Sequence, residues 1–338
     1  MPSPAAPSLD VRDLSVVFDI SRGRIEAVRN INLSVAPGEV VGLVGESGSG
    51  KSVTGFALMG LIDPPGRIAS GTIELAGHGD LLQKSPGELQ SLRGREIAMV
   101  FQDPMTTLNP VLTIGTQVTE AIHAHERVGR RAAFDRGVAA LRAVGIADPG
   151  ERMHAYPHHM SGGMRQRIAI AIAMLHRPKV LIADEPTTAL DVTIQGQILA
   201  QTQELCHEYG TAAIWITHDL AVVAGLADRV MVMYAGSIVE AGQVSDVIDR
   251  PLHHYTGGLI ASVPGGPLVG GRLAQIPGMA PDLLHRPAGC TFAPRCPRAD
   301  TACRQDLAWV ESQPGHRALC VHPLAADRGF PTSQMVTS

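Results

Sequence analysis

The sequence predicts an α/β fold with a mainly parallel β-sheet, and two observations carry this prediction. Strand-like and helical segments alternate between residues 163 and 234, which is typical of a parallel sheet covered by helices on both faces. An apolar stretch at residues 40–44 leads into a glycine-rich loop and reads as a buried strand. With 338 residues, 45% of them hydrophobic and 18% charged, the chain has the length and composition of a globular protein with a sizeable core.

A small β layer is expected before this core. Residues 14–18 and 31–35 alternate as strands do, and Pro37-Gly38-Glu39 predicts a turn ahead of the strand at 40–44.

The glycine-rich loop carries a specific motif. It reads Gly-Glu-Ser-Gly-Ser-Gly-Lys-Ser and fits G-x-x-x-x-G-K-[ST] at every fixed position. Glycines let backbone N–H groups turn inward around a polyphosphate, and the next helix directs its positive dipole end at the same charge. Lys51 is expected to reach the terminal phosphates and Ser52 to hold Mg²⁺. The motif predicts a P-loop NTPase core that binds phosphate through Gly45, Ser47, Gly48, Ser49, Gly50, Lys51 and Ser52.

A helical insertion follows residue 103. Residues 113–125 and 131–144 have helical periodicity, and strand-like runs are absent between residues 103 and 160.

The α/β alternation then resumes. The expected elements are helix 163–175, strand 180–183, helix 194–207, strand 212–217, helix 220–226 and strand 230–234. The strand at 180–183 ends in Asp184 and Glu185, at the carboxyl edge where open α/β sheets bind ligands. Asp184 can bind Mg²⁺ directly or through water, and Glu185 is placed to polarise a water directed at a γ-phosphate.

Ser161, Gly162 and Gly163 open the helix at 163–175. By physical chemistry alone Ser161 is an ordinary N-cap, although a donor-rich helix N-terminus also suits phosphate.

These motifs together resemble the nucleotide-binding subunit of an ATP-binding cassette (ABC) transporter. Residues 45–52 resemble its Walker A motif, the run ending at Asp184-Glu185 its Walker B motif, and Ser161-Gly162-Gly163 its signature motif. The other matches are Gln102 for the Q-loop, Thr188-Ala189-Leu190-Asp191 for the D-loop, His218 for the switch histidine and Phe18 for the adenine-stacking aromatic. The motifs follow the family's order across residues 8–250. Phe18 also fits an aromatic that packs into the core, and Met164 departs from the glutamine commonest in the signature.

The resemblance implies a RecA-like core with an antiparallel β subdomain, and a site shared between two cassettes. ATP on the Walker A motif of one cassette would be closed over by Ser161, Gly162 and Gly163 of the other. Glu185 would be the base or water-orienting group, and His218 would hold the γ-phosphate. Gln102 would couple the γ-phosphate and Mg²⁺ to the helical insertion. The implied Mg²⁺ ligands are Ser52, Gln102 and Asp184, and Asp191 also belongs to the nucleotide site.

The chain after residue 251 reads as a small cysteine-rich extension. Pro264-Gly265-Gly266-Pro267 and Gly270-Gly271 indicate loops, and four cysteines follow at 290, 296, 303 and 320. Grouped thiols in a reducing compartment favour metal ligation over disulfides, but their spacing leaves zinc, an iron–sulfur cluster and unligated thiols open. Cys206, alone on a predicted helix, is expected to be a buried apolar residue.

Residues 289–297 resemble the C-terminal extension of the di- and oligopeptide importer ATPases, and residues 156–158, 251–256 and 276–278 match that branch too. This resemblance implies a [4Fe–4S] cluster on Cys290, Cys296, Cys303 and Cys320. It also implies three parts: a nucleotide-binding core with the β subdomain (8–103 and 161–250), a helical subdomain that contacts permeases (104–160) and the extension (251–338).

The function implied is ATP hydrolysis that powers import of di- or oligopeptides, with another solute such as nickel left open. The implied partners are a homologous second ATPase in a heterodimer, two integral membrane permeases and an extracytoplasmic substrate-binding protein. The chain would then lie peripherally on the cytoplasmic face of the inner membrane.

Composition argues against other classes. Residues 1–10 lack the pattern of a secretory signal, and no apolar segment approaches the ~20 residues of a spanning helix. A net charge of -4 gives no reason to expect nucleic-acid binding. A cassette ATPase acting on DNA or ribosomes, and a regulatory cassette without hydrolysis, are the alternatives; Glu185 and His218 argue against the second.

Overall fold

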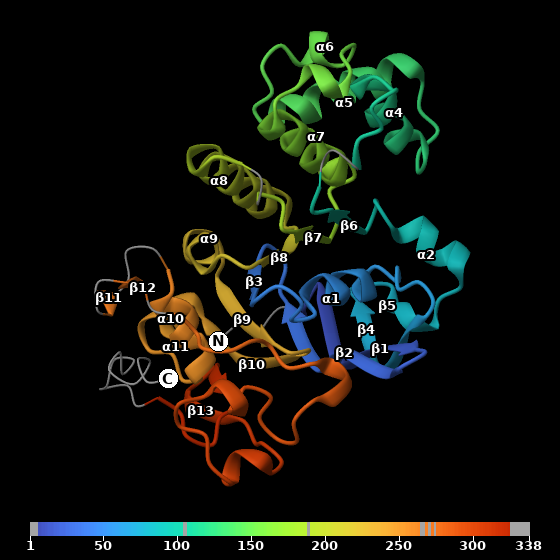
Figure 1. Cartoon of the computed structure of the whole chain (residues 1–338). Helices are drawn as coiled ribbons and strands as arrows, with labels where there is room; N and C mark the ends of the chain where they lie inside the picture. Colours follow the sequence, from blue (N-terminus) through green and yellow to red (C-terminus); the bar gives the residue numbers. More distant parts are fainter. Residues whose placement is uncertain are drawn as a thin grey trace. The chain divides into compact units, whose positions relative to one another are not determined.

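The computed structural model describes residues 6–103, 107–187, 190–263, 268–269, 272–273 and 275–324 (Figure 1). The described residues form two compact units, each assembled from separate stretches of chain. Unit 1 comprises those within Met1–Asp10, Leu33–Val40 and Ile73–Trp215. Unit 2 comprises those within Val11–Asn32, Val41–Thr72 and Ile216–Ser338.

The strands are, in chain order, β1 (Leu9–Ile20), β2 (Gly23–Val35), β3 (Val40–Val44), β4 (Gly66–Leu75), β5 (Gly79–Asp80), β6 (Ile97–Val100), β7 (Val180–Asp184), β8 (Ala212–Thr217), β9 (Arg229–Tyr234), β10 (Ser237–Gln243), β11 (Leu268–Val269), β12 (Arg272–Leu273), β13 (Val310–Gln313) and β14 (His316–Ala318). The α-helices are α1 (Lys51–Leu58), α2 (Pro86–Leu92), α4 (Ile114–His123), α5 (Arg130–Ala143), α6 (Pro149–Arg152), α7 (Gly162–Met174), α8 (Val192–Tyr209), α9 (Leu220–Leu226), α10 (Val244–Asp249) and α11 (His254–Ala261). Short 3-10 turns are η1 (Leu81–Gln83), η2 (Pro157–His159), η3 (Leu283–His285), η4 (Ala293–Arg295) and η5 (Ala302–Arg304).

Unit 2 contains a mixed sheet in the order β13-β14-β10-β9-β3. Strand β3 pairs in parallel with β9, with Val44 opposite Val232. Strands β9, β10, β14 and β13 then pair antiparallel with one another in turn, so β13 and β14 of the C-terminal extension extend the sheet that begins beside the phosphate loop. In the same unit β2, β1 and β4 lie next to one another in that order, which is the predicted small β layer.

Unit 1 contains the parallel pair β6 and β7, with Ile97 opposite Val180 and Val100 opposite Ala183, and β8 lies next to β7. All five residues of β7 are buried, as expected of a central parallel strand covered on both faces. Helices α4, α5, α6 and α7 cluster together beyond these strands (Figure 1), and α5 packs against α4 and α7.

Local sequence explains where the helices begin. Thr113 caps α4 by accepting a hydrogen bond from the Thr116 amide, and Ser85 and Glu88 form a capping box on α2. Helix α8 ends at Gly210, whose φ of 66° places it in the left-handed region that glycine adopts readily.

The α/β class with a P-loop core is confirmed, as are the expected helices at 113–125 and 131–144 and the alternating elements between residues 163 and 234, each to within two or three residues at its ends. Strands β4, β6 and β10 and the tail strands β13 and β14 were not expected. The loops predicted at 264–267 and 270–271 lie outside the described residues, and the three predicted domain ranges stay a prediction.

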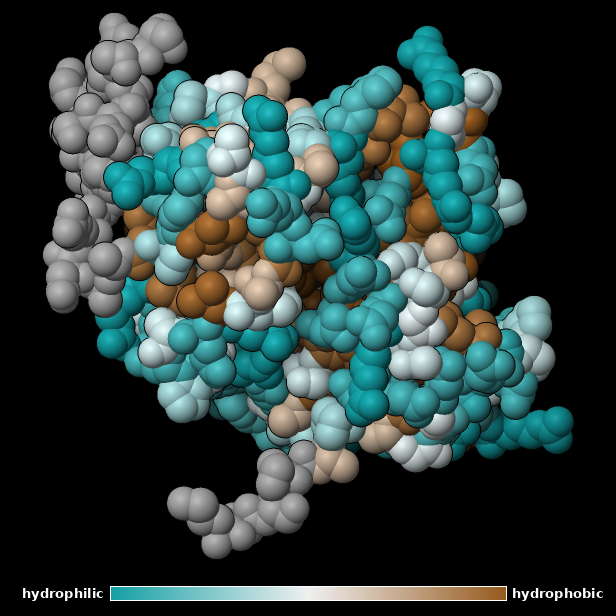
Figure 2. All heavy atoms as spheres, turned by 90° about the horizontal axis from the view of Figure 1, so that it is seen from below, coloured by the Kyte–Doolittle hydropathy of each residue, from teal (hydrophilic) through white to brown (hydrophobic). Residues whose placement is uncertain are grey.

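The face drawn in Figure 2 is mainly hydrophilic, with hydrophobic side chains in several separate patches. Within the described residues, no helix combines the length and the apolar character that crossing a membrane requires.

Candidate nucleotide site and cysteine pocket

The phosphate loop joins β3 to α1 within unit 2. The Lys51 ammonium donates hydrogen bonds to the backbone oxygens of Gly45 (2.8 Å) and Glu46 (3.0 Å), so the side chain lies back across its own loop. Gly50, at the N-cap of α1, has a φ of 104°, which an L side chain rarely adopts. A Cβ added to Gly45 would lie 2.1 Å from the backbone oxygen of Met233. Two of the motif's glycines are thus required by backbone geometry.

The loop is also fixed by its own backbone. The Ser49 amide donates to the Glu46 oxygen at 3.2 Å, and the Ser49 oxygen accepts from the Gly236 amide at 2.8 Å. Ser47 and Gly48 remain exposed, and Ser52 lies half-buried in the first turn of α1. Backbone N–H groups at the start of α1 therefore sit where a polyphosphate gains most from the helix dipole.

Two other predicted residues belong to unit 2. Phe18 is half-buried near the end of β1 and packs beside Gly66, where an added Cβ would lie 2.6 Å from its ring. His218 is exposed between β8 and α9, and the next residue, Asp219, caps α9 by accepting from the Ala221 amide.

The Walker B carboxylates belong to unit 1. Asp184 ends β7 and is 2% exposed, whereas Glu185 follows it with a φ of 45°. Such a left-handed backbone at a residue other than glycine costs on the order of 1–3 kcal/mol and tends to occur at functional sites. The Gln102 amide donates to a Glu185 carboxylate oxygen at 3.4 Å, so the structure brings these two predicted residues together.

The signature residues also lie in unit 1. Ser161 caps α7 by accepting from the Met164 amide at 3.3 Å, as its residue type indicates. Gly163 is buried against Ile194, and a Cβ on Gly162 would lie 3.3 Å from the Leu190 side chain. The signature turn therefore packs beside the end of the D-loop, where Asp191 is the exposed N-cap of α8. Thr188 and Ala189 of the D-loop lie outside the described residues.

The four tail cysteines line one small pocket in unit 2. Cys290, Cys296, Cys303 and Cys320 share its lining with His253 and Phe292, among others. Burial raises the pKa of Cys296 to about 11 and that of Cys320 to about 12. Cys206, by contrast, is buried in α8, as expected of an apolar residue.

The sequence reasoning missed several polar residues around these sites. Glu46 occupies a variable position of the loop motif, yet its carboxylate pairs with Arg295, 249 residues later in the chain. Asp300 and His322 lie with Cys303 within 4.8 Å of one another, close enough to bind one metal ion. No local sequence signal indicates either contact.

Comparisons with known proteins agree with this geometry. The ABC transporter family matches residues 28–188, and the family described as the C-terminal region of oligopeptide/dipeptide transporters matches residues 239–303. The oligopeptide transport ATP-binding protein OppD of Escherichia coli is 48% identical over 94% of this chain and 93% of its own length. The dipeptide transport ATP-binding protein DppD of the same organism is 47% identical over 96% of this chain and 99% of its own.

A solved structure is similar as well. The dimeric ATP-binding cassette MJ0796 bound to ADP and Pi aligns with a TM-score of 0.62 and 25% identity, over 70% of this chain and 98% of that one. One assignment follows from the phosphate loop, from the strand that ends in a carboxylate and from relatives that match nearly the whole chain. The chain belongs to the ABC transporter family of ATP-hydrolysing subunits, in its oligopeptide/dipeptide branch.

Proposed function

We propose that this chain powers the import of di- or oligopeptides by hydrolysing ATP as one subunit of a multi-subunit transporter. The observation that carries the proposal is the similarity to peptide-transport ATPases across both the nucleotide-binding region and the C-terminal region. Peptides are preferred over another solute such as nickel because the two Escherichia coli relatives are named for oligopeptide and dipeptide transport.

Within unit 2, the phosphate loop binds ATP. Lys51 turns from the loop carbonyls to the β- and γ-phosphates, and backbone N–H groups of Gly48 to Ser52 surround the same charge. Phe18 stacks on the adenine and His218 holds the γ-phosphate. The exposed position of His218 at the end of a strand supports its role.

Within unit 1, Glu185 orients the attacking water. Its contact with Gln102 supports this role, because the amide fixes the carboxylate in place and can report the state of the γ-phosphate to the helical insertion. Mg²⁺ would be held by Ser52, Gln102 and Asp184, and when bound it neutralises charge that develops on the phosphates.

The signature residues act in a second cassette. Ser161 is exposed at the N-terminus of α7, a position suited to a phosphate brought by another subunit. We infer that the partner is a homologous second ATPase, so that two different subunits share the composite sites. Two membrane permeases and an extracytoplasmic binding protein complete the importer, with this chain at the cytoplasmic face.

Turnover tests the enzymatic part. Glu185→Gln is expected to lower the ATPase rate of the assembled complex at least 100-fold while MgATP binding persists, because only water activation is lost. Glu204→Gln, an exposed residue of α8, is the matched control and is expected to keep the rate. Equal rates for Glu185→Gln and the unmodified complex would refute the proposal. Measuring the uptake of peptides and the uptake of nickel by the same complex identifies the transported solute.

We propose further that the cysteine pocket holds a [4Fe–4S] cluster. Four thiols converge on one pocket, which is the donor set that such a cluster requires.

A single metal ion is the second candidate, because Asp300, Cys303 and His322 offer three ligand atoms within reach of one ion. Elemental analysis of anaerobically purified protein separates the two. Four iron and four acid-labile sulfide per chain support the cluster, whereas stoichiometric zinc without iron refutes it. Asp300→Asn is expected to leave the iron content unchanged.

A further inference from the structure

The carboxylate of Glu46 is bound by a residue of the C-terminal extension. Both terminal nitrogens of Arg295 donate to it, at 2.8 Å to one oxygen and 3.0 Å to the other. The Arg295 side chain is 6% exposed and that of Glu46 29%, so water screens this pair less than it screens a surface pair. A bidentate pair of this kind fixes the direction of the carboxylate as well as compensating its charge.

Arg295 is itself held on several sides. Its Nε donates to the Pro277 oxygen at 2.8 Å, and Nη1 donates to the Tyr234 hydroxyl at 3.2 Å. The guanidinium carbon lies 5.8 Å from the centre of the Tyr234 ring and 5.9 Å from that of Phe292. A guanidinium with this many partners is a rigid support, because its fork cannot rotate without breaking them.

The backbone of Glu46 is bound from the same direction. Its amide donates to the hydroxyl of Tyr255, a fully buried residue of α11, at 2.8 Å. Its oxygen accepts from Lys51. Amide, oxygen and carboxylate of one loop residue are therefore all bound, two of the three by residues beyond position 250.

The charges at the phosphate loop indicate what the contact between Arg295 and Glu46 does. A glutamate within a phosphate loop places a negative charge beside the polyphosphate that the loop binds, and like charges at short range oppose binding. The bidentate pair with Arg295 cancels that charge and keeps the carboxylate in one place.

We propose that Arg295 is a positioning residue for ATP: the C-terminal extension neutralises Glu46 and holds the phosphate loop in its binding conformation. The proposal rests on the assignment of residues 45–52 to the ATP phosphates. Cys296 follows Arg295 directly in the chain and lines the cysteine pocket, so one short segment, η4 with its C-cap, serves both the pocket and the loop.

The test is equilibrium binding of MgATP to the full-length chain. Arg295→Met leaves Glu46 uncompensated and is expected to weaken MgATP binding at least tenfold at low ionic strength, and less at high salt, because salt screens the repulsion. Adding Glu46→Gln to Arg295→Met is expected to restore most of the affinity, since the opposing charge is gone. Arg304→Met, an exposed arginine of the same extension, is the matched control and is expected to bind MgATP normally.

Normal binding by Arg295→Met overturns the proposal. So does a loss that Glu46→Gln fails to reverse, because a merely structural role of Arg295 would not respond to removal of the Glu46 charge. If Arg295→Met shows no native thermal transition, Arg295→Lys is tested in its place, because lysine keeps the positive charge but lacks the two-pronged guanidinium. MgATP binding that is a few-fold weaker in Arg295→Lys supports the proposal. Unchanged MgATP binding overturns it. Lys51→Ala separates this result from the site assignment, since normal MgATP binding by Lys51→Ala would refute the assignment itself.

Discussion

At the scale of single residues, the glycines of the loop motif are required by the space and the conformation of the backbone. The motif fixes Gly45 and Gly50, and the structure gives the reasons: Gly45 lies against the backbone oxygen of Met233, and Gly50 turns the chain with a φ of 104°. These positions could be predicted from the sequence because the spacing of the glycines is itself a sequence pattern. It could not reveal the role of Glu46, whose partner Arg295 is distant in the chain, nor the left-handed backbone of Glu185.

Gly45→Ala is expected to weaken MgATP binding more than tenfold. Its Cβ would meet the Met233 backbone oxygen at 2.1 Å, and backbone cannot yield as a flexible side chain does, so the loop must shift. Gly225→Ala in α9 is the matched control. Nothing lies within 4 Å of the added Cβ, and alanine favours the helix by about 1 kcal/mol. Titration with MgATP compares the two variants, and equal affinities would show that the loop tolerates the displacement.

At the scale of elements, hydrophobic periodicity and capping residues predicted the helices and strands well. The helices expected at 113–125 and 131–144 are α4 and α5, and strand β7 ends at Asp184 as its apolar run indicates. The strand pairings of the tail could not be predicted, because β14 pairs with β10 through residues 76 and 78 positions apart (241 with 317, 240 with 318) and its three residues carry no periodic signal. Short strands are defined by their neighbours rather than by their own composition.

Ser161→Ala separates a helix cap from a catalytic contact. Loss of the cap on α7 is expected to lower the free energy of unfolding by about 1 kcal/mol, and Thr113→Ala on α4 should lower it by a similar amount. Only Ser161→Ala should also reduce the ATPase rate of the assembled complex, because only Ser161 would meet the partner's ATP. Chemical denaturation and turnover assays check both effects. If the two variants retain equal turnover, Ser161 is a cap and nothing more.

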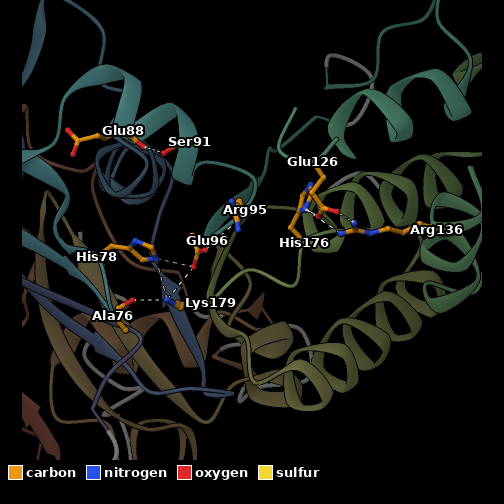
Figure 3. A network of polar contacts seen from close by, with 10 residues as sticks. All are labelled: Ala76, His78, Glu88, Ser91, Arg95, Glu96, Glu126, Arg136, His176 and Lys179. Atoms are coloured by element: carbon orange, nitrogen blue, oxygen red, sulfur yellow. Dashed lines mark hydrogen bonds and ion pairs between the residues drawn. The ribbon is translucent and has the colours of Figure 1, made fainter. Parts of the chain in front are cut away.

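The helical region of unit 1 contains a pH-sensitive ion pair, shown in Figure 3. The Arg136 guanidinium donates to the Glu126 carboxylate at 2.6 Å, and His176 meets its other oxygen at 2.9 Å. The ring of His125 meets the ring of His176 edge to face, with the ring centres 5.0 Å apart. The hydrogen bond from Arg136 holds the pKa of Glu126 below its ordinary value of 4.5. A carboxylate with a depressed pKa contributes stability above the unfolded value and loses it as the pH falls through the folded value.

Glu126→Gln is therefore expected to reduce the free energy of unfolding at pH 6 to 7 and to match the unmodified protein more closely as the pH falls below 4.5. The effect is small because the carboxylate is partly exposed. Urea unfolding across pH 3 to 7 measures it, with the exposed Glu208→Gln on α8 as control. A stability difference that stays constant over this range would contradict the role assigned to the Glu126 charge.

At the scale of the whole molecule, the extension is part of the core of unit 2. Phe292 and Cys303 pack in the same hydrophobic cluster as Val44, the residue that ends β3. Strand β14 adds His316, whose Nε2 meets the fully buried Glu240 of β10 at 2.8 Å, while the same carboxylate accepts from the amides of Leu252 and His253. A buried carboxylate with three partners from later in the chain depends on that part of the chain for its stability.

This packing predicts that damage to the extension reaches the nucleotide loop. Phe292 is 2% exposed and its ring centre lies 5.3 Å from that of Tyr234 and 5.5 Å from that of Tyr255. Phe292→Ala is expected to lower the free energy of unfolding of unit 2 by about 3–5 kcal/mol. MgATP binding should then disappear in the same, lowered thermal transition.

The control is Val310→Ala on β13, where the residue is 37% exposed and little packing is lost. Thermal unfolding followed by circular dichroism, together with MgATP binding at each temperature, compares the variants. An extension that folded by itself would give a separate thermal transition at lower temperature in Phe292→Ala. The temperature at which MgATP binding is half lost would then stay unchanged. The shared cluster around Phe292 and Val44 predicts one transition instead, because the hydrophobic contacts that hold the extension are the same contacts that support the strand before the phosphate loop.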